Sequence, residues 1–450
     1  MVFKRRHNWS LLTALLLAVI FIYSCSPDEF GFNPTPSPGR TEEQPSVRIP
    51  VKNYRNVLIL YLMGYNDLVY FLQTNINDLL ANPISKDPRD VVLIFSHMSN
   101  GYNFSTPTSP TLTKITQDFD GNVLRDTLMV LPKTQIATSP EVLNEVLTYV
   151  HANFESERYG MLMSSHGSGW VPAQYFLKGE NIGNRYDTQQ ENRMAMMSND
   201  MSSSGIYRER RHLLKSIGAH YPASNSIEID ITDLAQSIPF KLDYLIFDAC
   251  LMGGIEVAYE LRNVTDKMIA SQTEILADGM HYPSLCSLLF SQDSPDLVGV
   301  SRKFYELYER QSGDYKSCTI SLVDCTKLEN MAQVTRNIID QYRSNLAVVQ
   351  DNRDNIQKYF CDPYTSRQKW FYDFEDIITN CNLSEADSIT FESALKDVIL
   401  YKAATPRFLS SLRINHHSGL SMYLPFNTDR DNLNKFYKAL EWNKATGLIE

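Results

Sequence analysis

Apolar runs alternate with helix-type patterns along much of the chain. The runs 56–63 and 90–96 are almost continuously apolar, as is typical of strands that are buried on both faces. Between them, residues 66–80 carry apolar side chains at helical spacing, with Asn66 or Asp67 as the cap. A strand, a helix and a second strand in this order form a βαβ unit, so the pattern predicts a parallel sheet covered by helices.

The same kinds of pattern continue toward the C-terminus. Period-two alternation around Asp120 and Gly121 predicts a hairpin over 112–130, and a serine cap followed by Pro140 predicts a helix over 139–154. Further strands are expected at 159–165, 242–248, 267–272, 316–324 and 418–425. Further helices are expected at 254–261, 296–310, 329–346 and 391–403.

These elements divide the chain into two regions and one long connection. We expect an α/β core with a mostly parallel central sheet in residues 51–293, and a largely helical C-terminal region, 294–450, that returns one strand to the core. Residues 171–226 show little periodicity, which predicts a long loop. Long loops in compact domains are usually functional or mobile.

The N-terminus has the pattern of a targeting segment. Basic residues 4–6 precede an apolar stretch, 11–23, which is shorter than the ~20 residues of a spanning helix but suits a signal peptide. Cys25 then follows a serine, which resembles a bacterial lipobox. This predicts a lipoprotein signal peptide over 1–24, lipidation of Cys25, and a disordered Pro- and Ser-rich tether over 25–50. An ordinary cleaved secretory signal is the alternative.

An exported lipoprotein of the bacterial cell envelope is therefore expected, held to a membrane by its N-terminal lipid, with the outer membrane or the cell surface as candidate places. The net charge of −10 argues against a nucleic-acid partner, because no basic stripe is present. The six cysteines after Cys25 lack metal-type spacing and are expected to be buried thiols. No cofactor is expected, and calcium stays an open alternative that no calcium-loop motif supports. The adjacent His416 and His417 resemble a metal pair, but they should point in opposite directions, and no ligand partners are expected near them.

Two apolar runs end in small, glycine-flanked groups that carry reactive side chains. "LMSSHGSGW" contains His166, and "LIFDACLMGG" contains Cys250. Because the carboxyl ends of parallel strands meet at one edge of a sheet, these side chains can approach one another. A nearby histidine and a helix N-terminus both favour the thiolate, and the backbone N–H groups of Gly167 and Cys250 could form an oxyanion hole. The residues alone leave a catalytic pair and a buried core cysteine equally open.

The quoted motifs resemble a known family. "SSHGSGW" and "DACLMGGIEVAYEL", together with "YLMGYNDL", "IASQTEILADG" and "GLSMYLP", are similar to the clostripain family of cysteine peptidases, relatives of the caspases. The resemblance implies a caspase-like α/β/α fold with His166 as general base and acid and Cys250 as the nucleophile. It further implies that Asp248 and Asp278 face the residue before the cut bond, and it does not require a third catalytic residue.

The resulting hypothesis is a lipid-anchored cysteine endopeptidase that cleaves peptides or proteins after Arg or Lys. A cell-surface binding lipoprotein that keeps the fold without catalysis, and that holds a partner with its tyrosines, is the alternative. A basic-specific peptidase would also meet its own scissile bonds in the loop 171–226. The basic residues in this loop are Lys178, Arg185, Arg193, Arg208, Arg210, Arg211 and Lys215.

Overall fold

The computed structural model describes residues 53–450 apart from 101–102, 119, 174–227, 361–369 and 426–430. The chain separates into residues 1–50 and residues 51–450, and only the second unit is described. The expected signal peptide, Cys25 and the tether lie outside the described residues, as does most of the predicted loop 171–226. In the described part of the chain, every helix is too short or too polar to cross a membrane.

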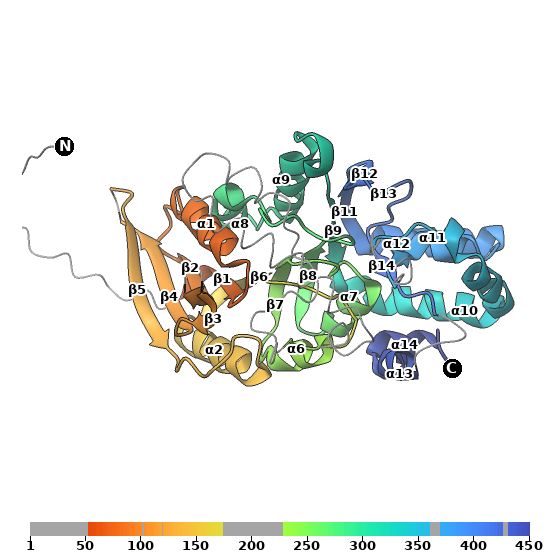
Figure 1. Ribbon diagram of the computed structural model, residues 1–450, viewed down its shortest axis with the longest axis horizontal. Coiled ribbons are helices and arrows are strands. Elements are labelled where there is room, and N and C mark those ends of the chain that lie inside the picture. The colour runs from red at the N-terminus through yellow and green to blue at the C-terminus, as the bar shows by residue number, and fades with distance from the viewer. Residues whose placement is uncertain (1–52, 101–102, 119, 174–227, 361–369, 426–430) are drawn as a thin grey trace, which may run out of the picture. The chain divides into compact units, whose positions relative to one another are not determined.

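A ten-stranded sheet forms the centre of this unit (Figure 1). Five strands run parallel in the order β2-β1-β6-β7-β8, and antiparallel strands extend both edges. The parallel strands are β1 (Tyr54–Gly64), β2 (Asp90–Asn100), β6 (Ser156–Ser164), β7 (Leu242–Asp248) and β8 (Thr265–Ala270). The others are β3 (Asn103–Pro107), β4 (Thr111–Gln117), β5 (Val123–Val130), β9 (Thr319–Asp324) and β11 (Ile399–Ala404).

Helices cover both faces of the sheet (Figure 1). One face carries α1 (Val69–Leu80), α8 (Leu285–Leu289) and α9 (Leu297–Glu309). The other carries α2 (Pro140–Asn153), α6 (Ile231–Ser237) and α7 (Ile255–Leu261). The predicted cap of α2 is present, since Ser139 Oγ accepts a hydrogen bond from the Val142 N–H at 3.2 Å. The α/β fold with a mostly parallel sheet is therefore confirmed.

The chain after the parallel strands is rich in helix. It forms α10 (Leu328–Asp351), α11 (Phe374–Thr379), α12 (Glu385–Val398), α13 (Asp431–Ala439) and α14 (Glu441–Thr446). Short pairs join β10 (Tyr372–Asp373) to β14 (Ser421–Met422) and β12 (Arg407–Phe408) to β13 (Leu412–Arg413). Single 3-10 turns lie at Tyr282–Ser284, Gly313–Tyr315, Cys325–Lys327 and Arg353–Asn355.

The C-terminal region differs from the pattern in two ways. It gives two strands to the main sheet, β9 and β11, while β14 pairs with β10 outside that sheet. The predicted helix 391–403 is wrong after Val398, where β11 begins. The residues of β11 alternate between half-buried and exposed, and its β-branched and aromatic side chains suit an edge strand better than a helix.

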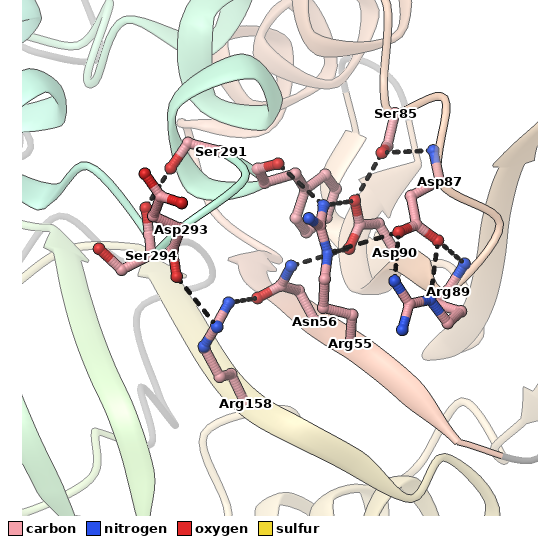
Figure 2. Close-up of polar contacts among 11 residues, drawn as sticks. Arg55, Asn56, Ser85, Asp87, Arg89, Asp90, Arg158, Ser291, Asp293 and Ser294 are labelled. Atoms are coloured by element: carbon pink, nitrogen blue, oxygen red, sulfur yellow. Dashed lines mark hydrogen bonds and ion pairs between the residues drawn. The ribbon is translucent and has the colours of Figure 1, made fainter.

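A charged network closes the amino ends of the parallel strands (Figure 2). Arg55 at the start of β1 donates to the buried Asp90 at the start of β2, at 2.9 Å for Nε to Oδ1. Arg55 also donates to the carbonyl of Phe290, and Asn56 and Ser85 donate to the same Asp90 carboxylate. The polar groups of this network are hydrogen-bonded to one another. The candidate active site lies at the opposite edge, beyond the carboxyl ends of the strands.

Candidate active site

Strand register brings the histidine and cysteine motifs together. Strands β6 and β7 pair in parallel with Ser164 opposite Asp248, and His166 and Cys250 each lie two residues further along. Gly167 packs directly on the nucleophile loop, because a methyl group at Gly167 would lie 2.4 Å from the Cys250 carbonyl oxygen and 3.0 Å from its nitrogen. Only glycine fits here, which explains the residue that follows His166.

The loop after His166 and the loop after Cys250 make a second close backbone contact, between Gly169 and Leu251. Gly169 has a φ of +60°, and a methyl group there would meet the Leu251 carbonyl oxygen at 2.6 Å. Leu251 itself has a φ of 62°, a conformation that costs a residue with a side chain about 1–3 kcal/mol. Backbone bonds from Leu251 N to Thr273 O, at 3.0 Å, and from Gly253 N to Ser271 O, at 2.8 Å, hold it. Strain of this kind is typical of functional loops.

Cys250 is distinguished from the other cysteines by its hydrogen bonding. It is fully buried, and its Sγ lies 3.2 Å from the Ile275 nitrogen, from which it accepts, and 3.8 Å from the Ile275 carbonyl oxygen. Burial raises the pKa of Cys286, Cys318 and Cys325 to about 12, so these three remain protonated. The described cysteines are all free and buried, as predicted, whereas Cys361 lies outside the described residues.

His166 is oriented by a carboxylate that the sequence did not indicate. Its Nε2 lies 2.8 Å from Oδ1 of Asp67, and both side chains are largely buried. Its Nδ1 is buried with no hydrogen-bond partner among the described residues. The predicted cap by Asn66 or Asp67 is wrong, because Leu68 holds the N-cap position of α1 without a side-chain cap, and Asn66 accepts from the Leu68 N–H at 3.0 Å in the turn before the helix. The available signal was the position of Asp67 just beyond β1, at the same sheet edge as His166.

The two predicted pocket carboxylates lie on the face covered by α8 and α9. Asp248 is fully buried, and its Oδ2 accepts from Ser164 Oγ at 2.7 Å and from the Tyr282 hydroxyl at 2.8 Å. Asp278 is exposed. Both charges act on the buried hydroxyl of Tyr308. Burial, and then the charges of Asp278 and Asp248, raise the pKa of Tyr308 well above its ordinary value. Gly279, the residue after Asp278, packs on Asp248, because a methyl group at Gly279 would lie 2.6 Å from Asp248 Oδ1.

A cavity of about 110 Å³ lies on the other side of His166. Its walls include His166, Met163 and Phe247, and it extends to Leu234 in α6. A single water needs roughly 10–15 Å³, so the space is large enough for a side chain. Cys250 and Asp248 do not line this cavity.

One group in the described chain has donor atoms placed for a metal ion, and it lies in the C-terminal region. His416 Nε2 is 3.0 Å from Glu375 Oε2 and 3.3 Å from Asp373 Oδ1. His417 Nδ1 lies 3.0 Å from the Tyr359 hydroxyl, which donates to Asp373 Oδ2, so both histidines are linked to the same carboxylate, and their opposite directions stay a prediction. The expectation that no ligand partners stand near them is wrong. Asp373 also caps α11 and accepts from the Ser418 N–H, so the group is accounted for as an ion-pair cluster.

A histidine and a cysteine thus lie two residues beyond paired positions of two adjacent parallel strands, with the buried Asp248 two residues before the cysteine. The model of the clostripain family matches residues 60–203 and 209–447, and the chain belongs to this family of cysteine peptidases.

One curated protein and two solved structures are also similar to this chain. Clostripain of Hathewaya histolytica is 27% identical over 151 residues, which cover 32% of this chain and only 23% of that protein. The structure of an inactive zymogen C11 protease from Parabacteroides distasonis is 26% identical, covers 88% of this chain and 99% of its own, and superposes with a TM-score of 0.65. A secreted C11 cysteine protease from Bacteroides thetaiotaomicron, bound to an irreversible peptide inhibitor, shares the fold at 21% identity, with coverages of 87% and 99% and a TM-score of 0.66.

Proposed function

We propose that this protein is an endopeptidase in which Cys250 and His166 form the catalytic dyad. The observation that carries the proposal is the β6–β7 register, which places both residues at the same depth beyond adjacent strands. Asp67 holds His166 through Nε2, which leaves Nδ1 as the ring nitrogen for proton transfer.

The reaction follows from this arrangement. His166 Nδ1 takes the thiol proton of Cys250, and the sulfur attacks the substrate carbonyl carbon while the oxygen becomes negative. The backbone N–H groups of Gly167 and Cys250 are the proposed donors to that oxygen. The imidazolium then gives its proton to the leaving nitrogen as the C–N bond breaks, and water later hydrolyses the thioester.

Cleavage after Arg, and less readily after Lys, is the proposed specificity. Asp248 supports it, because a buried carboxylate two residues before the nucleophile can meet a guanidinium through two parallel hydrogen bonds. Asp278, exposed beside it, adds negative charge at the entrance. A lysine ammonium is a strongly hydrated point charge and cannot form the planar fork.

The single-chain form is proposed to be latent. Both Cys250 and Asp248 are fully buried, and Tyr282 covers the carboxylate. The similar protein from Parabacteroides distasonis is described as an inactive zymogen. Self-cleavage within 171–226 would activate the chain, and the candidate bonds after the basic residues of that loop lie outside the described residues.

Export and lipid anchoring are proposed from the first 25 residues, with support from a structural neighbour that is described as secreted. Partition of the full chain into a detergent phase tests the anchor. Loss of that partition in Cys25→Ser is the expected result, and equal partition of both proteins would reject lipidation at Cys25.

The dyad is tested with the chain from residue 51, using fluorogenic peptides with Arg or Lys before the reporter. Cys250→Ala and His166→Ala should each lose nearly all turnover and remain single chains on a denaturing gel, with unchanged circular dichroism. Cys286→Ala is the matched control, because Cys286 is a buried free cysteine outside both motifs, and the nearby charge that acts on it is that of Asp90 at the amino ends of the strands. Undiminished turnover in Cys250→Ala would disprove the mechanism.

A further inference from the structure

Strand alternation places two spaces on opposite sides of the reacting atoms. Ser164 and Asp248 pair across β6 and β7, and their side chains face α8 and α9. Met163 and Phe247 pair one residue earlier, so their side chains face the opposite side, toward α6. The cavity lined by Met163 and Phe247 is therefore separated from the Asp248 pocket by the edge of the sheet, and His166 borders it.

The cavity is mainly apolar, and the polar side chains of His97 and Thr138 are among its lining residues. His97 in β2 is 1% exposed and lines the cavity, and its Nδ1 accepts a hydrogen bond from the Ala137 N–H at 3.3 Å. The proton of the neutral ring must therefore reside on Nε2. That Nε2 has no partner among the described residues, and neither does Thr138 Oγ1 on the adjoining wall. Both atoms are covered by their surroundings, so the surface that a ligand would meet in the cavity is mainly apolar.

Proton transfer identifies which part of a substrate lies beside this cavity. His166 must deliver its proton to the leaving nitrogen, so that nitrogen lies next to His166. The nitrogen belongs to the residue after the cut bond, whose side chain begins one atom further on. The residue before the cut bond is directed to the Asp248 side, so the cavity on the other side remains for the residue after the cut.

We propose that this cavity is the binding site for the side chain that follows the scissile bond, and that it selects long apolar side chains, with methionine preferred. Methionine fills irregular apolar space because its side chain is unbranched and flexible. Acidic side chains are disfavoured because the lining residues are mainly apolar and would leave the charge unsolvated. This inference rests on the proposed peptidase activity.

The site can be tested by measuring how the acyl-enzyme divides between hydrolysis by water and capture by added amino-acid amides. A blocked arginine ester acylates Cys250 without placing any residue in the cavity, and added amino-acid amides then compete with water for the thioester. Burying an apolar side chain contributes about 1.5–3 kcal/mol, so methionine amide and leucine amide should capture the acyl group roughly 10-fold or more better than glycine amide. Glutamate amide should be poorer than leucine amide.

Variants that fill the cavity complete the test. Ile229→Trp and Thr138→Phe introduce bulk from two different walls and should bring the methionine-to-glycine capture ratio close to one, while Val348→Trp, on the exposed face of α10, should leave the ratio unchanged. Equal capture of methionine and glycine amides by the wild type, with normal ester hydrolysis, would overturn the site alone. Absence of ester hydrolysis would overturn the proposed function and this site with it.

Discussion

Asp67 is the side chain on which the orientation of His166 depends. Its Oδ1 holds Nε2 at 2.8 Å, which fixes both the ring plane and the tautomer. Asp67→Asn can present an N–H instead of an acceptor, and the ring would then be held with the wrong nitrogen protonated. Since a general base contributes typically 10²–10⁴-fold, kcat should fall roughly 10- to 100-fold with little change in KM.

Steady-state kinetics on an arginyl peptide measure this effect. Asp78→Asn, an exposed carboxylate on α1, is the matched control and should behave as the wild type. A change confined to KM would show that Asp67 contacts substrate rather than positioning the imidazole.

Asp248 gives a second prediction at the scale of one residue. Losing one partner of a desolvated charge pair typically costs about 2–5 kcal/mol, so Asp248→Asn should lower kcat/KM for arginyl peptides by roughly 30-fold or more. Asp278→Asn should have a smaller effect, because that carboxylate is exposed. A peptide library varied only before the cut gives the values. Preference for an apolar or acidic residue there would mean that Asp248 does not contact the substrate.

Single residues also show how far the sequence could be interpreted. His166 and Cys250 were recognisable because each ends an apolar run beside glycine, and their loops meet in the structure. Asp67 was not, because Asp before a helix is usually a cap, and only the lateral order of β1 and β6 shows that it faces His166. The cover of Tyr282 over Asp248 depends on packing across the sheet, which no local pattern records.

At the scale of elements, the buried parallel strands were the most predictable. Continuous apolar runs marked β1, β2, β6 and β7 closely, since strands buried on both faces have no polar positions. The edge strand β11 was missed because it continues the helical pattern of α12 without a break, and only pairing with β9 makes it a strand. The two-residue strands β10 and β14 are too short to show a periodic pattern of apolar residues in the sequence.

The charged network at the amino ends of β1 and β2 gives a prediction at this scale. Arg55→Met would leave the fully buried Asp90 without its cation, a loss that typically costs about 3–5 kcal/mol of unfolding free energy. Arg89→Met is the matched control, because Arg89 is half-exposed and its pairing with Asp87 should contribute little. Urea unfolding in the Cys250→Ala background, which avoids self-cleavage, measures both. Equal effects would show that burial of Asp90 does not decide the cost.

For the whole molecule, Glu256 joins the catalytic half to the C-terminal half. It lies fully buried in the first turn of α7, and its Oε1 accepts from the Tyr423 N–H at 2.7 Å and the Tyr437 hydroxyl at 2.8 Å. Trp170, just after the His166 loop, packs against the same two tyrosines. Helix α7 therefore meets the end of the chain through hydrogen bonds, and the loop after His166 meets the same two tyrosines through ring contacts.

Burial raises the pKa of Glu256 from 4.5 to about 7. Folding therefore favours the protonated form, and its stabilising contribution is complete below pH 4.5 and is lost as the pH rises to about 7. Glu256→Gln keeps the shape without the charge, so it should be more stable than the wild type at pH 8, by on the order of 1–3 kcal/mol, and similar to it at pH 4.5. Thermal melts of both proteins across this range give the difference. The exposed Glu145→Gln should show no such trend, and a constant difference for Glu256→Gln would contradict the linkage.

Strands β6 and β7 are direct neighbours in the middle of the sheet, although more than seventy residues separate them in the chain. The polypeptide before that connection supplies His166 and Asp67, and the polypeptide after it supplies Cys250 and Asp248. Neither half contains a complete sheet or both residues of the proposed dyad. The protein is thus suited to complementation from two genes: polypeptides 51–173 and 228–450, each inert alone, would regain peptidase activity only by pairing β6 with β7, and turnover would report their association.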